Sequence, residues 1–262
     1  MWREIVELSR PKNVVLAAIT VPLGAHLALS GAWSTQALSL VALQTISAIC
    51  FMAAGNTLND IADVSIDKEA KPNKPIPAQR VSIDQATKIA YSFSLLSATF
   101  MAVGAYLSDE PIPIVLIWSI AAFLMYTYDS GFQTKKMGLL GNIAISLMVG
   151  AVIVFGAAAV SKADTELVIY ASIVAFFANL AREIIKDCED METDEGRRTL
   201  PMRIGLMNAR ATAYVFILAS MVTLGLAHYT GPLEYHQMVF HAPAMFVLFS
   251  LNGPLFLGDD HK

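Results

Sequence analysis

The chain has 262 residues, of which 55% are hydrophobic and 15% are charged, and its formal net charge is −4. Soluble globular proteins carry about 25% charged residues, so this composition excludes an ordinary soluble domain and predicts a membrane protein. The acidic residues are concentrated in clusters, so the net charge does not identify a partner, and nucleic acid is not expected as one. The two cysteines, Cys50 and Cys188, imply no disulfide.

Apolar runs long enough to cross a hydrocarbon core of roughly 30 Å predict the membrane spans. There are eight, at about 14–29, 37–58, 89–107, 111–128, 138–160, 167–181, 211–229 and 235–257. They are not short alternations of apolar and polar residues, so helices are expected rather than a barrel. The first run also resembles a signal peptide, but Glu4 and Glu7 interrupt the positive leader that a signal peptide needs.

The lysines and arginines predict how these spans are oriented, because short cytoplasmic loops hold an excess of basic residues. If the N-terminus is inside, Lys162 is the only one of the 18 Lys and Arg residues that falls in an outside segment. If one span too many or too few had been assigned before residue 210, the basic residues would no longer fall almost entirely in inside segments. We therefore expect a multi-pass protein of the cell membrane.

Two acidic motifs of identical spacing follow apolar runs at the predicted cytoplasmic ends of spans. In "NDIADVSID" the motif is Asp60, Asp63 and Asp67, and in "DCEDMETD" it is Asp187, Asp190 and Asp194. If the helices continue, two faces each carry a ladder of oxygen ligands: Asn59, Asp63 and Asp67 on one, and Glu183, Asp187, Asp190 and Asp194 on the other.

Stacked carboxylates repel one another, so a helix that keeps them needs a counterion. Carboxylate and amide oxygens suit Mg²⁺, with Mn²⁺ as the alternative, and two such faces can hold metal ions on both sides of a diphosphate. A single cluster would more often be a solvated helix end. Two clusters of the same spacing in the same leaflet favour a metal site.

Basic residues follow each acidic motif, as expected where an anion shares its charge between metal and side chains. Those after the first motif are Lys71, Lys74 and Arg80, and those after the second are Arg197 and Arg198. A third predicted cytoplasmic segment, "YTYDSGFQTKKMGLLGN", contributes Tyr126, Lys135 and Lys136 as further candidate substrate-binding residues. Its Asn142 stands at the start of a span, where an amide is expected to bond a neighbouring helix.

These stretches together resemble the intramembrane prenyltransferase superfamily typified by UbiA. The resemblance is carried by "NDIADVSID", "KPNKPIPAQRVS", "KKMGLLGN" and "REIIKDCEDMETDEGRRTLP", and extends from about Ser9 to Gly205. Within the superfamily, the second motif followed by "RTLP" looks most like the archaeal-type geranylgeranylglycerol-phosphate geranylgeranyltransferases.

The resemblance implies one all-helical membrane domain over residues 1–262, with eight or nine spans around a central cavity and a polar cap on the cytoplasmic side. The repeated order of carboxylates, basic residues and Leu/Ile-Pro looks like two duplicated halves, about 1–130 and 131–262. The family's metal residues, carried onto this sequence, are Asn59, Asp60, Asp63, Asp67, Asp187, Asp190 and Asp194. Mg²⁺ would bridge them to a prenyl diphosphate, with Asp63, Asp67, Asp187 and Asp190 as catalytic residues.

The expected reaction is ionisation of an allylic diphosphate and capture of the allylic cation by an acceptor. The archaeal-type resemblance implies geranylgeranyl diphosphate as donor and the hydroxyl of geranylgeranylglyceryl phosphate as acceptor, which makes an ether lipid. Two alternatives stay open at this point. One is an aromatic acceptor such as 4-hydroxybenzoate, and the other is a divalent-cation transporter, since intramembrane carboxylates also mark ion pathways.

Overall fold

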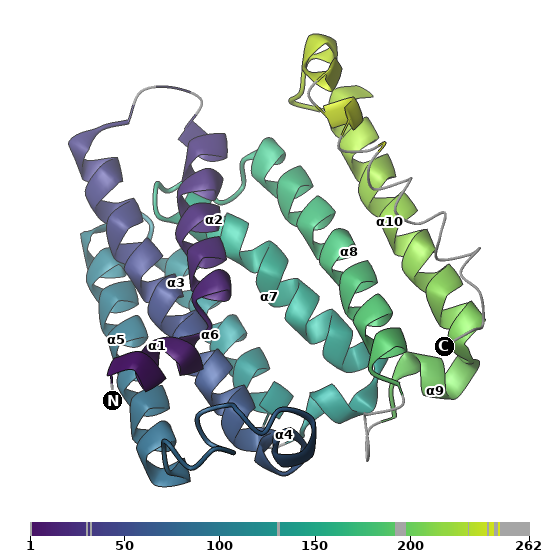
Figure 1. Ribbon diagram of the computed structural model, residues 1–262. Coiled ribbons are helices and arrows are strands. Elements are labelled where there is room, and N and C mark those ends of the chain that lie inside the picture. Colours follow the sequence, from purple (N-terminus) through teal and green to yellow (C-terminus); the bar gives the residue numbers. More distant parts are fainter. Residues whose placement is uncertain are drawn as a thin grey trace. The chain divides into compact units, whose positions relative to one another are not determined.

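The computed structural model describes residues 2–29, 31, 33–129, 132–191, 198–229, 231–239, 241–243 and 246. Every regular element in these ranges is a helix (Figure 1). Seven helices are long and apolar enough to cross a membrane: α2 (Pro11–Leu29), α3 (Thr35–Ala62), α5 (Ile83–Leu107), α6 (Pro111–Asp129), α7 (Leu139–Ala158), α8 (Glu166–Glu189) and α10 (Leu206–Tyr229). This confirms the expected helical fold in the described residues, and helices long and apolar enough to span a membrane lie at the first seven expected spans. The eighth expected span, 235–257, lies mostly outside the described residues.

Shorter helices connect or flank these spans. They are α1 (Trp2–Ser9), α4 (Val64–Ala70), α9 (Leu200–Ile204) and two 3₁₀ turns, η1 (Thr134–Met137) and η2 (Tyr235–Gln237). Helix starts carry local signals. Ser34 caps α3 through the amide of Ala37, and Ser82 forms a capping box with Gln85 at the start of α5.

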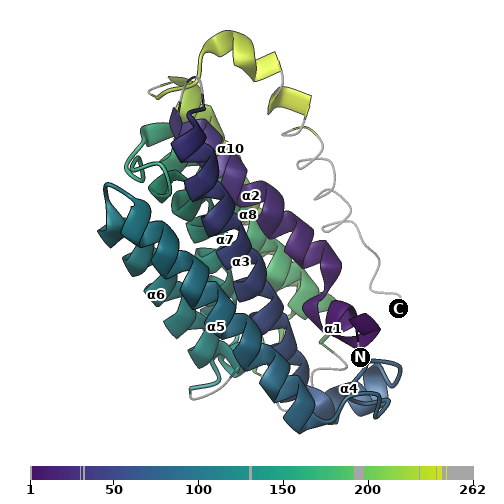
Figure 2. The ribbon, with the colours of Figure 1, turned by 90° about the vertical axis from the view of Figure 1, so that its left-hand side faces the viewer.

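The chain divides into two compact units, residues 1–132 with 151–168 and residues 133–150 with 169–262. In the first unit α3 packs against both α2 and α5, α5 packs against α6, and α1 packs on α3 (Figures 1 and 2). The core of this unit gathers side chains from four helices and the second part of α7, among them Val21, Val41, Met101, Ile114 and Phe155.

Two glycines allow α2 and the second part of α7 to touch through their backbones. A Cβ atom placed on Gly24 would stand 2.0 Å from the carbonyl oxygen of Ile153, and one on Gly156 would stand 2.0 Å from that of Val21. No side chain fits at such distances. This is the close packing through small residues by which membrane helices associate, since lipid offers little hydrophobic driving force between them.

The second unit is built from the first part of α7 with α8, α9 and α10. Its core includes Leu180, Ile184, Ala213 and Ile217. Hydroxyl groups tie the helices together, because Ser172 on α8 donates to the carbonyl of Gly150 on α7 (3.0 Å) and Ser220 on α10 donates to that of Val174 on α8 (3.1 Å). Both acidic motifs stand at the ends of long helices, the first at the end of α3 and the second at the end of α8.

Candidate metal-binding and catalytic site

The first acidic motif does not lie on one continuous helix. α3 ends at Ala62, Asp63 has φ −94° and ψ 7°, and α4 begins at Val64. The condition for a ladder of Asn59, Asp63 and Asp67, one helix that continues through all three, is therefore not met, although Asn59 and Asp63 still lie side by side. Stacked carboxylates repel one another, and aspartate is a weak helix former because its side chain competes with the backbone for hydrogen bonds.

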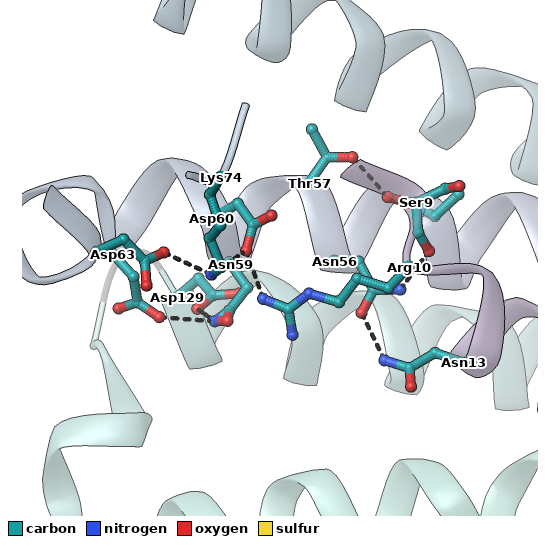
Figure 3. Close-up of polar contacts among 12 residues, drawn as sticks. Ser9, Arg10, Asn13, Asn56, Thr57, Asn59, Asp60, Asp63, Lys74 and Asp129 are labelled. Carbon is teal, nitrogen blue, oxygen red and sulfur yellow. Dashed lines mark hydrogen bonds and ion pairs between the residues drawn. The ribbon is translucent and has the colours of Figure 1, made fainter. Parts of the chain in front are cut away.

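Asp60 and Asp67 instead meet across this interruption, at the ammonium group of Lys74. Lys74 Nζ lies 3.0 Å from Asp60 Oδ1 and 2.6 Å from Asp67 Oδ2. Arg10 forms a second ion pair with Asp60 (Figure 3). Both aspartates are buried, with 4% of each residue exposed.

Asn59 and Asp63 form a separate polar group that also includes Asp129, the last residue of α6 (Figure 3). Asn59 Nδ2 lies 3.1 Å from Asp63 Oδ2 and 3.5 Å from Asp129 Oδ1. The amide oxygen and nitrogen of Asn59 are assigned from such contacts, and a half-turn of the amide would present the oxygen in their place. Asp129 is a residue of this group that was not predicted from the sequence. Its one signal was its position at the end of an apolar run, like that of Asn59.

The start of the chain is fastened to the same region. Arg80 donates to both carboxylate oxygens of Glu7 (2.8 Å each) and to the carbonyl of Asn73 (2.8 Å). The Glu7 carboxylate raises the pKa of Arg80, so the guanidinium stays charged. Two residues after Glu7, the carbonyl of Ser9 accepts a hydrogen bond from the side chain of Asn56 on α3 (2.8 Å). Arg80, a candidate substrate-binding residue, is thus engaged by a carboxylate in this structure.

The second motif lies in the other unit, where Asn142 on α7 donates to Asp187 Oδ2 on α8 at 2.8 Å. This confirms that Asn142 bonds a neighbouring helix. Glu183, one turn earlier on α8, is 8% exposed and pairs with Arg182, and Asp190 directly follows the end of α8. Asp194 and Arg197 lie outside the described residues.

Polar side chains continue from Asp187 along the two helices. Ser146 Oγ donates to the carbonyl of Asn142 (2.7 Å), and Asn179 Nδ2 donates to Ser146 Oγ (3.1 Å). Ser146 is fully buried. Ser146 and Asn179 were not predicted from the sequence, because each is a single polar residue within an apolar run.

The basic residues of this unit come together through backbone contacts. The amide of Arg198 donates to the carbonyl of Lys136 (3.3 Å), and Gly138, with φ +65°, lies so close that a Cβ there would stand 2.6 Å from the Arg198 carbonyl oxygen. Lys136 and Arg198 are exposed, whereas Lys135 is 8% exposed. In the first unit, Lys71 is exposed and Tyr126 on α6 is 63% exposed.

The carboxylate and amide side chains at both motifs fit a magnesium ion that also binds the phosphate oxygens of a substrate. Among the described residues no three Asp, Glu, His or Cys side chains are grouped so that they could hold a metal ion. Each motif instead pairs a carboxylate with an amide, Asp63 with Asn59 and Asp187 with Asn142. Mg²⁺ is commonly held by one or two carboxylates and completes its coordination with water and substrate phosphates.

The fold and these clusters define a class: helical membrane proteins with carboxylate and amide oxygens, followed by basic residues, at the ends of long helices. The model of the UbiA prenyltransferase family matches residues 14–253, and the chain belongs to that family.

Similar proteins include two enzymes named digeranylgeranylglyceryl phosphate synthase. The one from Pyrococcus abyssi is 33% identical, over 84% of this chain and 76% of its own. The one from Thermococcus gammatolerans is 34% identical, over 90% of this chain and 82% of its own.

Solved structures show the same fold. A UbiA homologue from Aeropyrum pernix K1 superposes with a TM-score of 0.77 at 19% identity, covering 95% of this chain and 90% of that one. A UbiA homologue from Archaeoglobus fulgidus, bound to DMAPP and Mg²⁺, superposes with a TM-score of 0.73 at 16% identity, covering 99% and 89%.

Proposed function

We propose that this chain transfers a geranylgeranyl group from geranylgeranyl diphosphate to the hydroxyl of geranylgeranylglyceryl phosphate, in a reaction that requires Mg²⁺. The observation that carries the proposal is the similarity to digeranylgeranylglyceryl phosphate synthases at 33% and 34% identity over most of the chain. The polar groups at the ends of α3 and α8 give that activity a chemical basis in this chain.

Of the metal residues expected from the sequence, we propose Asn59 and Asp63 of the first motif, and Asp187, Asp190 and Asp194 of the second, as the oxygen ligands of Mg²⁺, with Mn²⁺ as a substitute. Asp60 and Asp67 were expected as metal residues too, but their carboxylates pair with Lys74 in the structure. The proposed ligands would hold the metal ion, which would supply positive charge against the negative charge that builds on the departing diphosphate. Asn142 orients Asp187 through its 2.8 Å hydrogen bond. Such partners of ligating carboxylates fix the direction in which the ligand oxygen points.

The chain's own residues then serve each stage of the transfer. The exposed side chains of Lys71, Lys136 and Arg198 bind phosphate oxygens, while Tyr126 lines the path of the substrate. The bond between C1 of the allylic group and the diphosphate oxygen breaks, and the diphosphate keeps the bonding electrons. The acceptor hydroxyl oxygen forms the new bond to C1 and loses its proton. Apolar helices exclude water, which would otherwise capture the allylic cation.

We further propose that the protein crosses the cell membrane eight or nine times, with both motifs at the cytoplasmic side. The proposed topology rests on the distribution of the lysines and arginines, of which only Lys162 falls in a predicted outside segment.

The test uses purified full-length protein in detergent with Mg²⁺ and labelled geranylgeranyl diphosphate. Geranylgeranylglyceryl phosphate and 4-hydroxybenzoate are offered in parallel. We expect an ether product from the glyceryl phosphate and its loss on chelation of the metal. If 4-hydroxybenzoate is labelled faster than the glyceryl phosphate, the proposed acceptor is wrong and the acceptor is aromatic. No transfer to either acceptor, together with Mn²⁺ uptake by protein-containing vesicles, would favour a transporter.

A further inference from the structure

We propose that His228 and His241 form a binding site for a divalent transition-metal ion such as Zn²⁺ or Cu²⁺. His228 is in the last turn of α10, and His241 follows η2, so both residues belong to the second unit. A bound ion fastens the residues after η2 to the end of α10. This site takes no part in the proposed prenyl transfer and is separate from the proposed magnesium site.

The histidine pair is far from the second acidic motif. α8 and α10 run in opposite directions (Figure 1), and they are level where Ser220 donates to the carbonyl of Val174. From that level α8 continues to Asp187, while α10 continues the other way to His228. The two residues are therefore about 30 Å apart along the helix axes, since each residue of a helix rises about 1.5 Å.

A backbone contact fixes which ring nitrogen of His228 carries the proton. His228 Nδ1 lies 3.2 Å from the carbonyl oxygen of Glu234, and a carbonyl only accepts hydrogen bonds, so Nδ1 is the donor. In the neutral ring, Nε2 is then left with its lone pair. Histidines that bind metal ions are held in this way, with the second ring nitrogen donating to a carbonyl or a carboxylate.

The lone pair of His228 Nε2 faces a second imidazole at a distance that suits one shared ion. Nε2 lies 3.1 Å from His241 Nδ1, and the ring centroids are 5.2 Å apart. Zinc binds imidazole nitrogen at about 2.0–2.1 Å with tetrahedral geometry, which places two ligand nitrogens about 3.3 Å apart. Without an ion the rings share a hydrogen bond. His241 becomes a ligand when its proton moves from Nδ1 to Nε2, which leaves the ring neutral.

The backbone that orients His228 is itself held in place. The amide of Leu233 donates to the carbonyl of Ala227 (3.0 Å), which folds the chain back on the end of α10. Glu234 then starts η2 with a capping box that involves Gln237. His228 is only 3% exposed. One ligand is therefore fixed in direction before any ion binds, and only His241 has to adjust.

The chemistry of the pair selects a transition metal over Mg²⁺. Imidazole nitrogen suits Zn²⁺, Cu²⁺ and Ni²⁺, whereas Mg²⁺ prefers oxygen ligands. The sequence has no lysine or arginine between Arg210 and Lys262, so no basic neighbour in this stretch repels a cation. Glu234, whose side chain is exposed, adds a negative charge beside the pair. Water completes the coordination of an ion that has two protein ligands.

The closing experiment measures metal binding rather than activity. Full-length protein in detergent, with any affinity tag removed, carries Asp63→Asn and Asp187→Asn to weaken the proposed magnesium site. This parent protein is titrated with Zn²⁺ alone by calorimetry, and the electron paramagnetic resonance spectrum of equimolar Cu²⁺ is recorded. The test variants add His228→Gln or His241→Gln. The matched control adds His26→Gln, which removes an exposed histidine of α2.

We expect the parent to bind Zn²⁺, with excess Mg²⁺ unable to compete. His228→Gln and His241→Gln should each weaken Zn²⁺ binding at least about tenfold and reduce the number of imidazole nitrogens coupled to Cu²⁺. His26→Gln should keep the Zn²⁺ affinity within about threefold. An ion that binds only the folded state stabilises it, so Zn²⁺ should raise the melting temperature of the parent and the control but not of the test variants.

Equal Zn²⁺ affinity in the parent and both test variants would mean that the two histidines share only a hydrogen bond, and would overturn the proposal. Displacement of Zn²⁺ by Mg²⁺ would overturn it as well. If His228→Gln lowers the melting temperature without Zn²⁺, the half-buried His241 decides the question through His241→Gln. None of these measurements depends on prenyl transfer, so a failure of the proposed function leaves them valid.

Discussion

Asn142 on α7 holds the carboxylate of Asp187 on α8 through a 2.8 Å hydrogen bond from its amide nitrogen. Asn142 is itself 7% exposed, and the Ser146 hydroxyl bonds its carbonyl. The second acidic motif is therefore oriented by a neighbouring helix rather than by its own. Because the Asn142 amide orients the Asp187 carboxylate, a substitution of Asn142 should weaken the binding of a metal ion to Asp187.

The first prediction follows from that contact. Asn142→Leu keeps the approximate size of the side chain but removes the donor to Asp187. Loss of such an orienting partner typically weakens metal binding by about 10–100-fold. We expect the Mg²⁺ concentration for half-maximal activity to rise by that factor, with Mn²⁺ binding weakened in parallel. Asn208→Ala, which removes an exposed amide bonded to the Ile204 carbonyl, is the control and should change neither quantity. An unchanged Mg²⁺ requirement in Asn142→Leu would contradict this role.

The second prediction concerns the two carboxylates at the centre of the motifs. Asp63→Asn and Asp187→Asn should each lower kcat at least about a hundredfold, because an amide is a poorer magnesium ligand and the lost stabilisation is greatest in the transition state. The melting temperature in detergent should stay close to that of the unchanged protein, since apolar packing holds the helices. Near-normal turnover in both variants would rule out these residues as metal ligands.

The spans and both motifs could be predicted from the sequence because they depend on local patterns. Runs of apolar residues mark the helices, and the spacing of the aspartates is visible in the chain itself. The interruption at Asp63 could not be predicted in the same way. The stretch "NDIADVSID" contains no glycine or proline that would mark a break. The interruption is also slight, because the amide of Asp63 still donates to the Asn59 carbonyl (3.0 Å) and that of Asp67 to the Asp63 carbonyl (2.8 Å).

The partners of the first motif were missed because they are distant in the chain. Arg10 and Asp60 are 50 residues apart, and Asn59 and Asp129 are 70 apart. A basic residue before a span is expected for topology alone, so Arg10 carried no separate signal. Lys74 was recognised as a cation near the motif, but composition does not distinguish a lysine that binds a phosphate from one that binds two aspartates.

The third prediction tests the contact between α2 and α7. A Cβ atom at Gly24 or Gly156 would stand 2.0 Å from a backbone oxygen of the other helix, so the backbones must separate. We expect Gly24→Val and Gly156→Val each to lower the melting temperature in detergent by several degrees. Gly225→Ala on α10 is the matched control. Nothing lies within 4 Å of a Cβ there, so it should be neutral or slightly stabilising through helix propensity. Equal melting temperatures for all three would contradict the close approach.

The fourth prediction concerns orientation in the membrane. After Cys50 and Cys188 are replaced by serine, single cysteines are introduced at Asn73 and at Asp109, both exposed loop positions. A membrane-impermeant maleimide applied to intact cells should label position 109, and position 73 only after the membrane is opened. The basis is the distribution of basic residues. Labelling of position 73 in intact cells would place the first motif on the outer side and overturn the proposed topology.

The last prediction separates the acceptor from the donor. A phosphorylated acceptor carries up to two negative charges into a region already rich in carboxylates, so it needs cations beyond those that serve the diphosphate. Arg80 and Lys74 are two of the basic residues expected to bind substrate, but in the structure both pair with carboxylates. Of the basic residues that the sequence predicted to bind substrate, Lys71, Lys136 and Arg198 are exposed in the described part of the chain and not paired with a carboxylate in this way, and they are the candidates that we test.

We expect alanine at one of these three positions to raise the KM for geranylgeranylglyceryl phosphate by about 10–100-fold, while the KM for geranylgeranyl diphosphate changes less than about threefold. A lost charge-assisted contact to phosphate costs about 1.5–3 kcal/mol, which corresponds to that range. Lys88→Ala is the control, because Lys88 is exposed and paired with Asp84, and it should change neither KM. If all three substitutions raise the two KM values equally, these cations serve the diphosphate alone, and the acceptor need not carry a phosphate.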